Sequence, residues 1–184
     1  MTEFSAALEA GRTSTEEALT IFDSLEPVAT DFMLGAWQGA GFPTDHPLDG
    51  VLETYHWHGK RFESPEDVHP LLFSSRSGRL TRVNPLLVMP GMGLLHVLPF
   101  LKSEFAGRFF QAFLPLLATR RSRARLRLTT YRGQSSATMI YDHLPINDVF
   151  RKVDDKTVLG AMDMKGDDRP FFFVLRRETV AGGS

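Results

Sequence analysis

Residues Tyr141 to Gly166 read YDHLPINDVFRKVDDKTVLGAMDMKG, and Arg169-Pro170-Phe171-Phe172-Phe173 follows shortly after them. Apolar side chains recur here at β-strand spacing, with charged residues placed among them where an ordinary sheet does not need them. Residues 147–153 and 156–165 predict a hairpin whose turn is Asp154-Asp155, and residues 170–177 predict one further strand. The C-terminal third is therefore expected to form an antiparallel meander.

The residues before this stretch contain the most regular alternation in the chain. Arg123, Arg125 and Arg127 fall on one face of residues 119–131, and Ala124, Leu126 and Leu128 fall on the other. Arg132-Gly133 predicts a hairpin tip, and residues 135–141 predict the partner strand. A row of arginines suggests RNA or anionic lipid, but more often it is the solvated face of an amphipathic strand.

The N-terminal part combines a helix with a glycine-flanked tryptophan. Ser14 or Thr15 can cap a helix whose apolar face runs from Ala18 to Leu25. The motif Gly35-Ala36-Trp37-Gln38-Gly39 follows, and residues 51–62 alternate well enough to predict a strand. Ser64-Pro65-Glu66-Asp67 predicts the start of a short helix.

The middle of the chain is its most apolar part. Residues 85–101 read PLLVMPGMGLLHVLPFL, in which three prolines and two glycines interrupt any helical backbone. A transmembrane segment is therefore not expected. Apolar residues then recur every fourth position and predict an amphipathic helix with an aromatic stripe: Leu101, Phe105, Phe109, Phe113 and Leu117. We expect residues 85–117 to form a jointed, apolar lid or portal.

Composition limits the class of protein. With 184 residues, 42% hydrophobic and 23% charged, the chain is expected to be one soluble domain, residues 1–184. A net charge of -1 argues against nucleic-acid binding. No cysteine is present, which excludes disulfides, thiolate nucleophiles and cysteine-type zinc sites. The acidic, polar N-terminus does not read as a signal peptide, so a cytoplasmic location is expected.

Several motifs together resemble one family. They are Gly35 to Gly39, YHWHGKRF at residues 55–62, VHPLLF at residues 68–73, and the stretch from Tyr141 that opens this description. The chain resembles the bacterial and fungal family named for the GXWXG motif, followed by its usual companion, domain of unknown function 4334. The GXWXG part is expected at residues 14–80 and the C-terminal meander at residues 119–178. The resemblance implies no settled activity.

A helix that leads into a Gly-X-Trp strand and many antiparallel strands is similar to lipocalin-like and fatty-acid-binding-like barrels. That analogy implies a mainly β fold, with an N-terminal helix and a tryptophan that plugs one end of the barrel. A closed meander of about eight to ten strands has no free edges and can enclose a ligand. The alternative is a half-open sheet around the Phe105–Phe113 helix, without a cavity.

The candidate site residues are polar or aromatic groups within the strands. On the predicted strand 51–62, Trp57 shares a face with Arg61, whereas Lys60 falls with His56 and His58. The C-terminal motif holds a second set, which is either a structural ion-pair network or the polar floor of a pocket: Asp142, Asp148, Arg151, Asp163 and Lys165. The ligand-binding candidates are Trp57, Lys60, Arg61, Tyr141, Asp142, Arg151, Asp163 and Lys165. The structural candidates are Gly35, Trp37 and Gly39.

No metal or other cofactor is expected. His56 and His58 are two apart on a predicted strand, but no HExxH-like signature supplies further ligands. Barrels of similar appearance that bind haem use a histidine close to the C-terminus, and FFFVLRRETVAGGS contains none. Neither a GxGxxG fingerprint nor a Gly-x-Ser-x-Gly elbow is present.

Three hypotheses about function remain open. The first is a barrel that binds a hydrophobic or amphipathic small molecule, such as a lipid or a fatty-acid-like compound. The second is an isomerase or hydrolase that uses Asp142, Asp163 or Tyr141 as acid–base groups on an apolar substrate. The third is a structural module whose phenylalanine-rich helix forms a homodimer interface.

Overall fold

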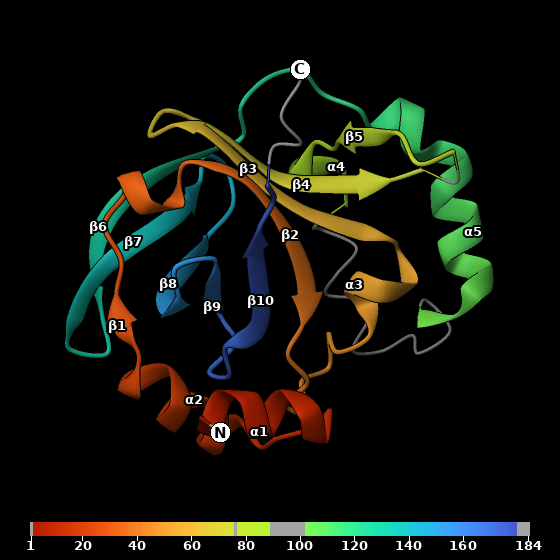
Figure 1. Ribbon diagram of the computed structural model, residues 1–184. Coiled ribbons are helices and arrows are strands. Elements are labelled where there is room, and N and C mark those ends of the chain that lie inside the picture. The colour runs from red at the N-terminus through yellow and green to blue at the C-terminus, as the bar shows by residue number, and fades with distance from the viewer. Residues whose placement is uncertain (1, 76, 89–101, 180–184) are drawn as a thin grey trace.

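The computed structural model describes residues 2–75, 77–88 and 102–179. Its core is a closed barrel of eight antiparallel strands, β2, β3, β4, β6, β7, β8, β9 and β10 (Figure 1). Each strand pairs with the next of these in the chain, and β10 closes the barrel by pairing with β2. The expected antiparallel meander is therefore confirmed. It includes strands of the N-terminal part as well as the C-terminal third.

The strand bounds fall into two groups along the chain. The first strands are β1 (Glu26–Pro27), β2 (Gly35–Gly41), β3 (Trp57–Ser64), β4 (Asp67–Ser74) and β5 (Leu80–Arg82). The second are β6 (Ala124–Tyr131), β7 (Gln134–Tyr141), β8 (Ile146–Asp154), β9 (Thr157–Met164) and β10 (Phe171–Arg177). The short strands β1 and β5 extend the sheet by pairing with β8 and β4.

The helical elements precede, interrupt and flank these strands. They are α1 (Glu3–Ala10), α2 (Thr15–Ser24), η1 (Asp31–Met33), α3 (Val51–Thr54), α4 (Pro85–Val88), α5 (Glu104–Phe113) and η4 (Leu114–Leu117). Helix α2 begins at the expected place, because Ser14 and Glu17 form a reciprocal capping box. Helix α1 has no counterpart among the sequence predictions. No helix among the described residues is both long and apolar enough to cross a membrane.

Strands β8, β9 and β10 are buried on both faces. Phe150, Val158 and Phe173 belong to the cluster that fills the barrel, whereas Leu159 and Phe172 belong to a second cluster with α1 and α2. Figure 1 shows both helices below the barrel strands. This double burial explains why the C-terminal sequence is so rich in apolar residues, since both faces of each strand must be covered.

Two predicted elements of the N-terminal part differ from the structure. The strand expected over residues 51–62 begins only at Trp57, because Val51–Thr54 forms a helical turn. There the Thr54 hydroxyl donates a hydrogen bond to the Gly50 carbonyl, and Glu53 Oε1 accepts one from the Gly41 N–H. The helix expected from Ser64 is instead the turn between β3 and β4, because Ser64 Oγ accepts hydrogen bonds from two backbone N–H groups that follow it.

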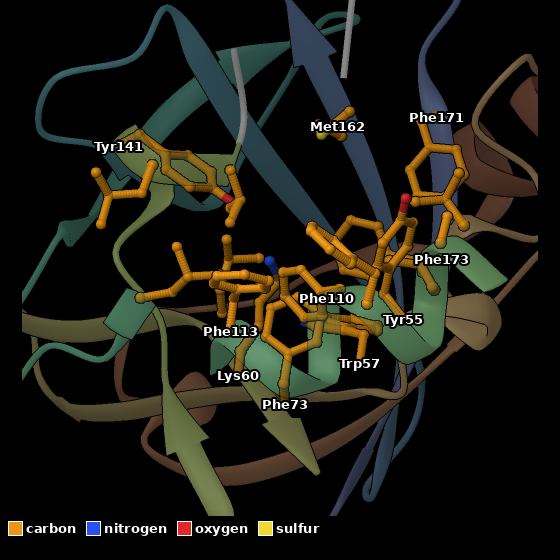
Figure 2. A pocket seen from close by; sticks show the side chains of 18 of the residues that line it. Tyr55, Trp57, Lys60, Phe73, Phe110, Phe113, Tyr141, Met162, Phe171 and Phe173 are labelled. Carbon is orange, nitrogen blue, oxygen red and sulfur yellow. The ribbon is translucent and has the colours of Figure 1, made fainter. Parts of the chain in front are cut away.

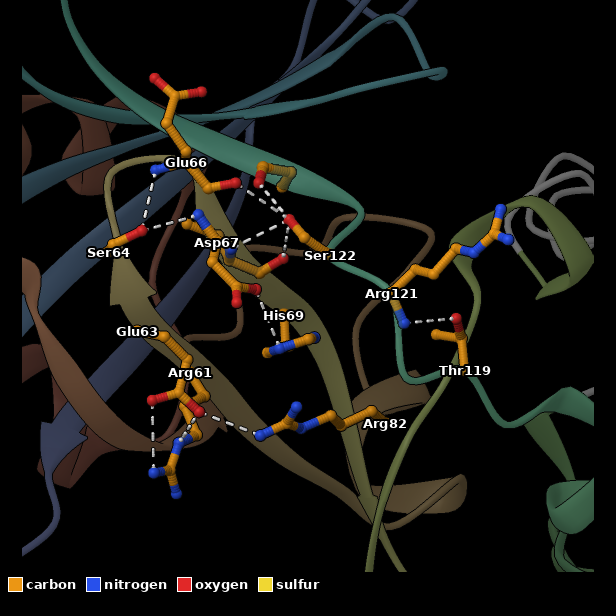
Figure 3. Close-up of polar contacts among 12 residues, drawn as sticks. Arg61, Glu63, Ser64, Glu66, Asp67, His69, Arg82, Thr119, Arg121 and Ser122 are labelled. Atoms are coloured by element: carbon orange, nitrogen blue, oxygen red, sulfur yellow. Dashed lines mark hydrogen bonds and ion pairs between the residues drawn. The ribbon is translucent and has the colours of Figure 1, made fainter.

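The barrel has a sparse seam between β4 and β6. The two strands share one paired position, Val68 with Ala124. Ser122 supplements it: its hydroxyl oxygen accepts a hydrogen bond from the Val68 N–H at 3.1 Å and lies 3.0 Å from the Ala124 carbonyl oxygen (Figure 3). The Ser122 side chain thus helps to close the barrel where few backbone pairs join β4 and β6.

Candidate functional site: an apolar cavity with a buried ion pair

A cavity of about 590 Å³ lies between the inner face of the barrel and the helices α3, α4 and α5. Its walls are almost entirely apolar and rich in aromatic rings (Figure 2). Phe110 of α5 packs edge-on against Tyr55 and Phe73, each at 5.0 Å between ring centroids. Trp57 packs edge-on against Phe173 at 5.9 Å. These contacts hold the rings in fixed orientations around the space.

Two charged side chains form the polar floor of the cavity. Lys60 comes from β3 and Asp148 from β8, and Lys60 Nζ lies 2.8 Å from Asp148 Oδ2. Both side chains are almost fully buried, with 4% and 1% of their surface exposed. Burial raises the pKa of Asp148, and the nearby Lys60 opposes that rise. Burying a pair of this kind costs desolvation free energy, and the attraction between the two charges must offset that cost.

Further polar atoms near this pair have no hydrogen-bond partner among the described residues. Asp148 Oδ1 accepts no hydrogen bond from any described residue, and the Trp57 indole N–H donates none. The Tyr141 hydroxyl also has no hydrogen bond within the described part of the chain, and its side chain lines the same cavity (Figure 2). Burial, and then the charge of Asp148, raise the pKa of Tyr141 well above its ordinary value, so this hydroxyl keeps its proton.

A β-bulge brings Lys60 into the barrel. The pairing of β3 with β4 shifts register between Trp57 and Gly59 and again between Gly59 and Arg61. Gly59 has φ of 149°, and a Cβ there would lie 1.9 Å from the Trp37 carbonyl oxygen. As a result Trp57 and Lys60 both face inward, which corrects the expectation that Trp57 shares its face with Arg61.

Gly39 of the GXWXG motif shapes the same wall. A Cβ at this position would lie 2.0 Å from the ring of Trp57, so the indole occupies the space that a side chain would take. The motif thus lets the Trp57 ring pack directly against the backbone of β2. Trp57 is in turn a wall of the cavity, which connects the motif to the site.

The other residues of the motif support the barrel. Trp37 is fully buried, donates a hydrogen bond from Nε1 to the Met33 carbonyl at 2.7 Å, and does not line the cavity. The Arg177 guanidinium lies 4.2 Å from its ring centroid and donates a hydrogen bond to the Leu34 carbonyl. Gly35 has φ of 116°, a value that favours glycine.

Of the ligand-binding candidates, Trp57, Lys60 and Tyr141 line the cavity, and the structure adds Asp148 to them. Arg61 points away from the cavity and pairs with Glu63, which also pairs with Arg82 (Figure 3). Asp148 could have been assigned an inward position, because Ile146 and Phe150 share its strand face and both are buried in the barrel core.

The remaining candidates lie outside the cavity. Arg151 is fully buried beneath α2, where its guanidinium stacks 5.0 Å from the Phe22 ring and donates a hydrogen bond to the Tyr131 carbonyl. Asp142 and Lys165 are exposed, and Asp163 is half-buried opposite Asn147. No ion pair joins Asp163 to Lys165 in the described part of the chain.

The predicted lid segment, residues 85–117, lies partly outside the described residues. Its described elements α4, α5 and η4 contribute Leu87, Phe110 and Leu117 to the cavity lining. The expected aromatic stripe forms on α5, but Phe105 is 77% exposed and Phe109 60% exposed. These rings lie at the edge of the cavity instead of in the core.

The residues described contain no group of three or more His, Asp or Glu side chains arranged to hold a metal ion. The buried His46 instead holds a loop in place. His46 Nδ1 accepts a hydrogen bond from the Leu48 N–H, and its Nε2 lies 3.2 Å from Asp167 Oδ2. Burial lowers the pKa of His46, which favours a neutral ring.

The fold and the cavity define a small closed β-barrel with an apolar interior and one polar floor. Residues 20–78 match the model for GXWXG protein, and residues 122–177 match domain of unknown function 4334. The chain is similar to a protein from Thermomonospora curvata of known crystal structure, with 33% identity, 96% of each chain covered and a TM-score of 0.70. No curated protein matches it. The chain belongs to the GXWXG family, with domain of unknown function 4334 in its C-terminal part.

Proposed function

We propose that this protein binds one hydrophobic or amphipathic small molecule, of the size of a lipid chain, inside its barrel. The observation that supports the proposal is the aromatic cavity of about 590 Å³ between the barrel and α5. Ligand sites commonly have volumes of about 300–1,000 Å³ and apolar walls with a few polar groups. The apolar tail would pack among Trp57, Phe73 and Phe110, and the polar end would meet Lys60, Tyr141 and Asp148.

Burial of the tail supplies the driving force. Apolar surface removed from water stabilises a complex by about 25 cal/mol per Å² before the costs of association are subtracted. The polar floor contributes mainly orientation, because hydrogen bonds to a ligand replace hydrogen bonds to water. A ligand that enters the cavity with its polar end first is therefore expected to place that end at Lys60 and its apolar tail toward α5.

The proposal is tested by filling the cavity. Ala106 of α5 lines the cavity, so Ala106→Trp places an indole inside it. Leu128→Trp is the matched control, because Leu128 is 60% exposed on β6 and is not part of the lining. The neutral fluorophore N-phenylnaphthylamine should bind the wild type and the control with one-to-one stoichiometry and bind Ala106→Trp much more weakly. Equal binding by all three proteins, or binding by none, would contradict the proposal.

A second candidate function is acid–base catalysis on such a ligand. It is favoured by one observation: Asp148 and Tyr141, a potential base and a hydroxyl donor, face the same apolar cavity. Asp148 would remove a proton from the carbon next to a ketone, and Tyr141 would stabilise the oxygen. In heavy water, the wild type would then introduce deuterium at that carbon of methyl decyl ketone, and Asp148→Asn would not. Absence of exchange in the wild type excludes this activity for the ketone.

A further inference from the structure

We infer that the cavity selects a ligand whose polar end is an uncharged oxygen group, a ketone or an alcohol, over a carboxylate of equal length. This inference rests on the proposed function and specifies its ligand class. It follows from two features of the floor: the charge that is already neutralised there, and the hydrogen-bonding atoms that are left over.

The charge of Lys60 is already neutralised. Asp148 Oδ2 lies 2.8 Å from its ammonium nitrogen, and both side chains are shielded from water. A carboxylate ligand would bring a second negative charge beside Asp148 in a medium of low dielectric constant. Like charges at such sites repel strongly, and an unpaired buried charge is costly. No other charged side chain lines the cavity within the described residues to compensate it.

The hydrogen-bonding atoms left over favour a neutral oxygen. The Lys60 ammonium has three hydrogens, of which one reaches the Pro70 carbonyl at 3.3 Å and one faces Asp148. Its third hydrogen and the Tyr141 hydroxyl donate to no described residue, so both remain as donors. A carbonyl or alcohol oxygen can accept from both. An alcohol can also donate to Asp148 Oδ1, which accepts no hydrogen bond from a described residue.

This reasoning makes Asp148 the residue that determines ligand charge. Asp148→Asn keeps the size of the side chain but removes the charge that neutralises Lys60. The ammonium then lacks a counter-ion, and a carboxylate ligand supplies one. The preference should therefore reverse in this variant. Asp168→Asn is the matched control, because Asp168 is exposed in the loop before β10.

The experiment measures displacement of N-phenylnaphthylamine by four compounds of equal chain length: methyl decyl ketone, dodecanol, dodecanoic acid and dodecane. Near neutral pH, the wild type and Asp168→Asn should bind the ketone and the alcohol at least about tenfold more tightly than the acid. Asp148→Asn should bind the acid more tightly than the ketone. Dodecane reports the contribution of the tail alone.

The outcomes distinguish the inference from the function on which it rests. If neither the fluorophore nor any of the four compounds binds, the proposed function fails. If the wild type binds dodecanoic acid as tightly as the ketone, the function stands and the inference is overturned. The wild-type comparison decides this even if Asp148→Asn does not fold. A folded Asp148→Asn protein that keeps the wild-type order of ligands would also overturn it.

Discussion

Replacing Lys60 with methionine should destabilise the protein by an amount that grows with pH. The change removes the only cation beside Asp148 among the described residues that line the cavity, and it leaves a carboxyl group that is 1% exposed. In the folded variant this group avoids an unpaired buried charge by taking up a proton. Its folded pKa is then raised above the unfolded value, so the folded state is favoured at low pH and loses stability as pH rises.

The size of this destabilisation follows from the free energy that is needed to keep Asp148 protonated in the folded state. Each pH unit above the ordinary aspartate pKa of about 3.9 costs about 1.4 kcal/mol while Asp148 stays neutral in the folded state. The cost is therefore about 1.5 kcal/mol near pH 5 and about 4 kcal/mol near pH 7. The second value agrees with the ~3–5 kcal/mol that is typical when one partner of a buried ion pair is removed.

Urea denaturation of the wild type, Lys60→Met, Asp148→Asn and Lys60→Met/Asp148→Asn at both pH values tests this reasoning. The double variant contains no ionisable group at the floor, so it should recover much of the lost stability near pH 7 and show little extra pH dependence. A Lys60→Met deficit that is equal at both pH values would refute the account. So would a double variant whose deficit equals the sum of the two single deficits.

Three further predictions concern other parts of the fold. Gly39→Ala should lower stability by roughly 2–3 kcal/mol, because its Cβ would overlap the Trp57 ring, and an unchanged melting temperature would show that the ring has room to move. Phe110→Ala should cost roughly 2 kcal/mol or more in urea denaturation, whereas Phe109→Ala, at an exposed position, should cost well under 1 kcal/mol. Burial lowers the pKa of His46, so the neutral ring contributes to the stability of the folded state above about pH 6.5, and this contribution is lost as the pH falls below that value. The fall in melting temperature between about pH 7.5 and 5.5 should therefore be smaller in His46→Gln than in the wild type. An equal fall in both proteins would contradict this reasoning.

Local periodicity was sufficient to predict the meander. Residues 123–130 alternate cleanly, and β6 and β7 form with the turn at Arg132-Gly133 as predicted. The hairpin of β8 and β9 and the final strand β10 also form where the sequence places them. These elements depend on local pattern and turn chemistry, which a single sequence contains.

The site was harder to predict because it depends on contacts between distant residues. The inward position of Lys60 requires the bulge at Gly59, and that bulge is set by the close approach of β2 at Trp37. Strict alternation cannot reveal such a shift, since one extra residue exchanges the two faces of a strand. The helical turn at Val51–Thr54 likewise depends on a contact between Glu53 and β2. Arg151 appeared to be a site residue because the burial of the outer barrel face under α2 cannot be deduced from spacing.

The most direct test of the cavity's role is an NMR measurement of contacts between a bound ligand and labelled methionine methyl groups. Met162 lines the cavity, whereas Met33 is fully buried next to Trp37 and lies outside the lining. With methyl decyl ketone bound, we expect nuclear Overhauser effects between the alkyl chain and the Met162 methyl group, and none to Met33. Binding that leaves the Met162 methyl group without such contacts would place the ligand elsewhere and contradict the account.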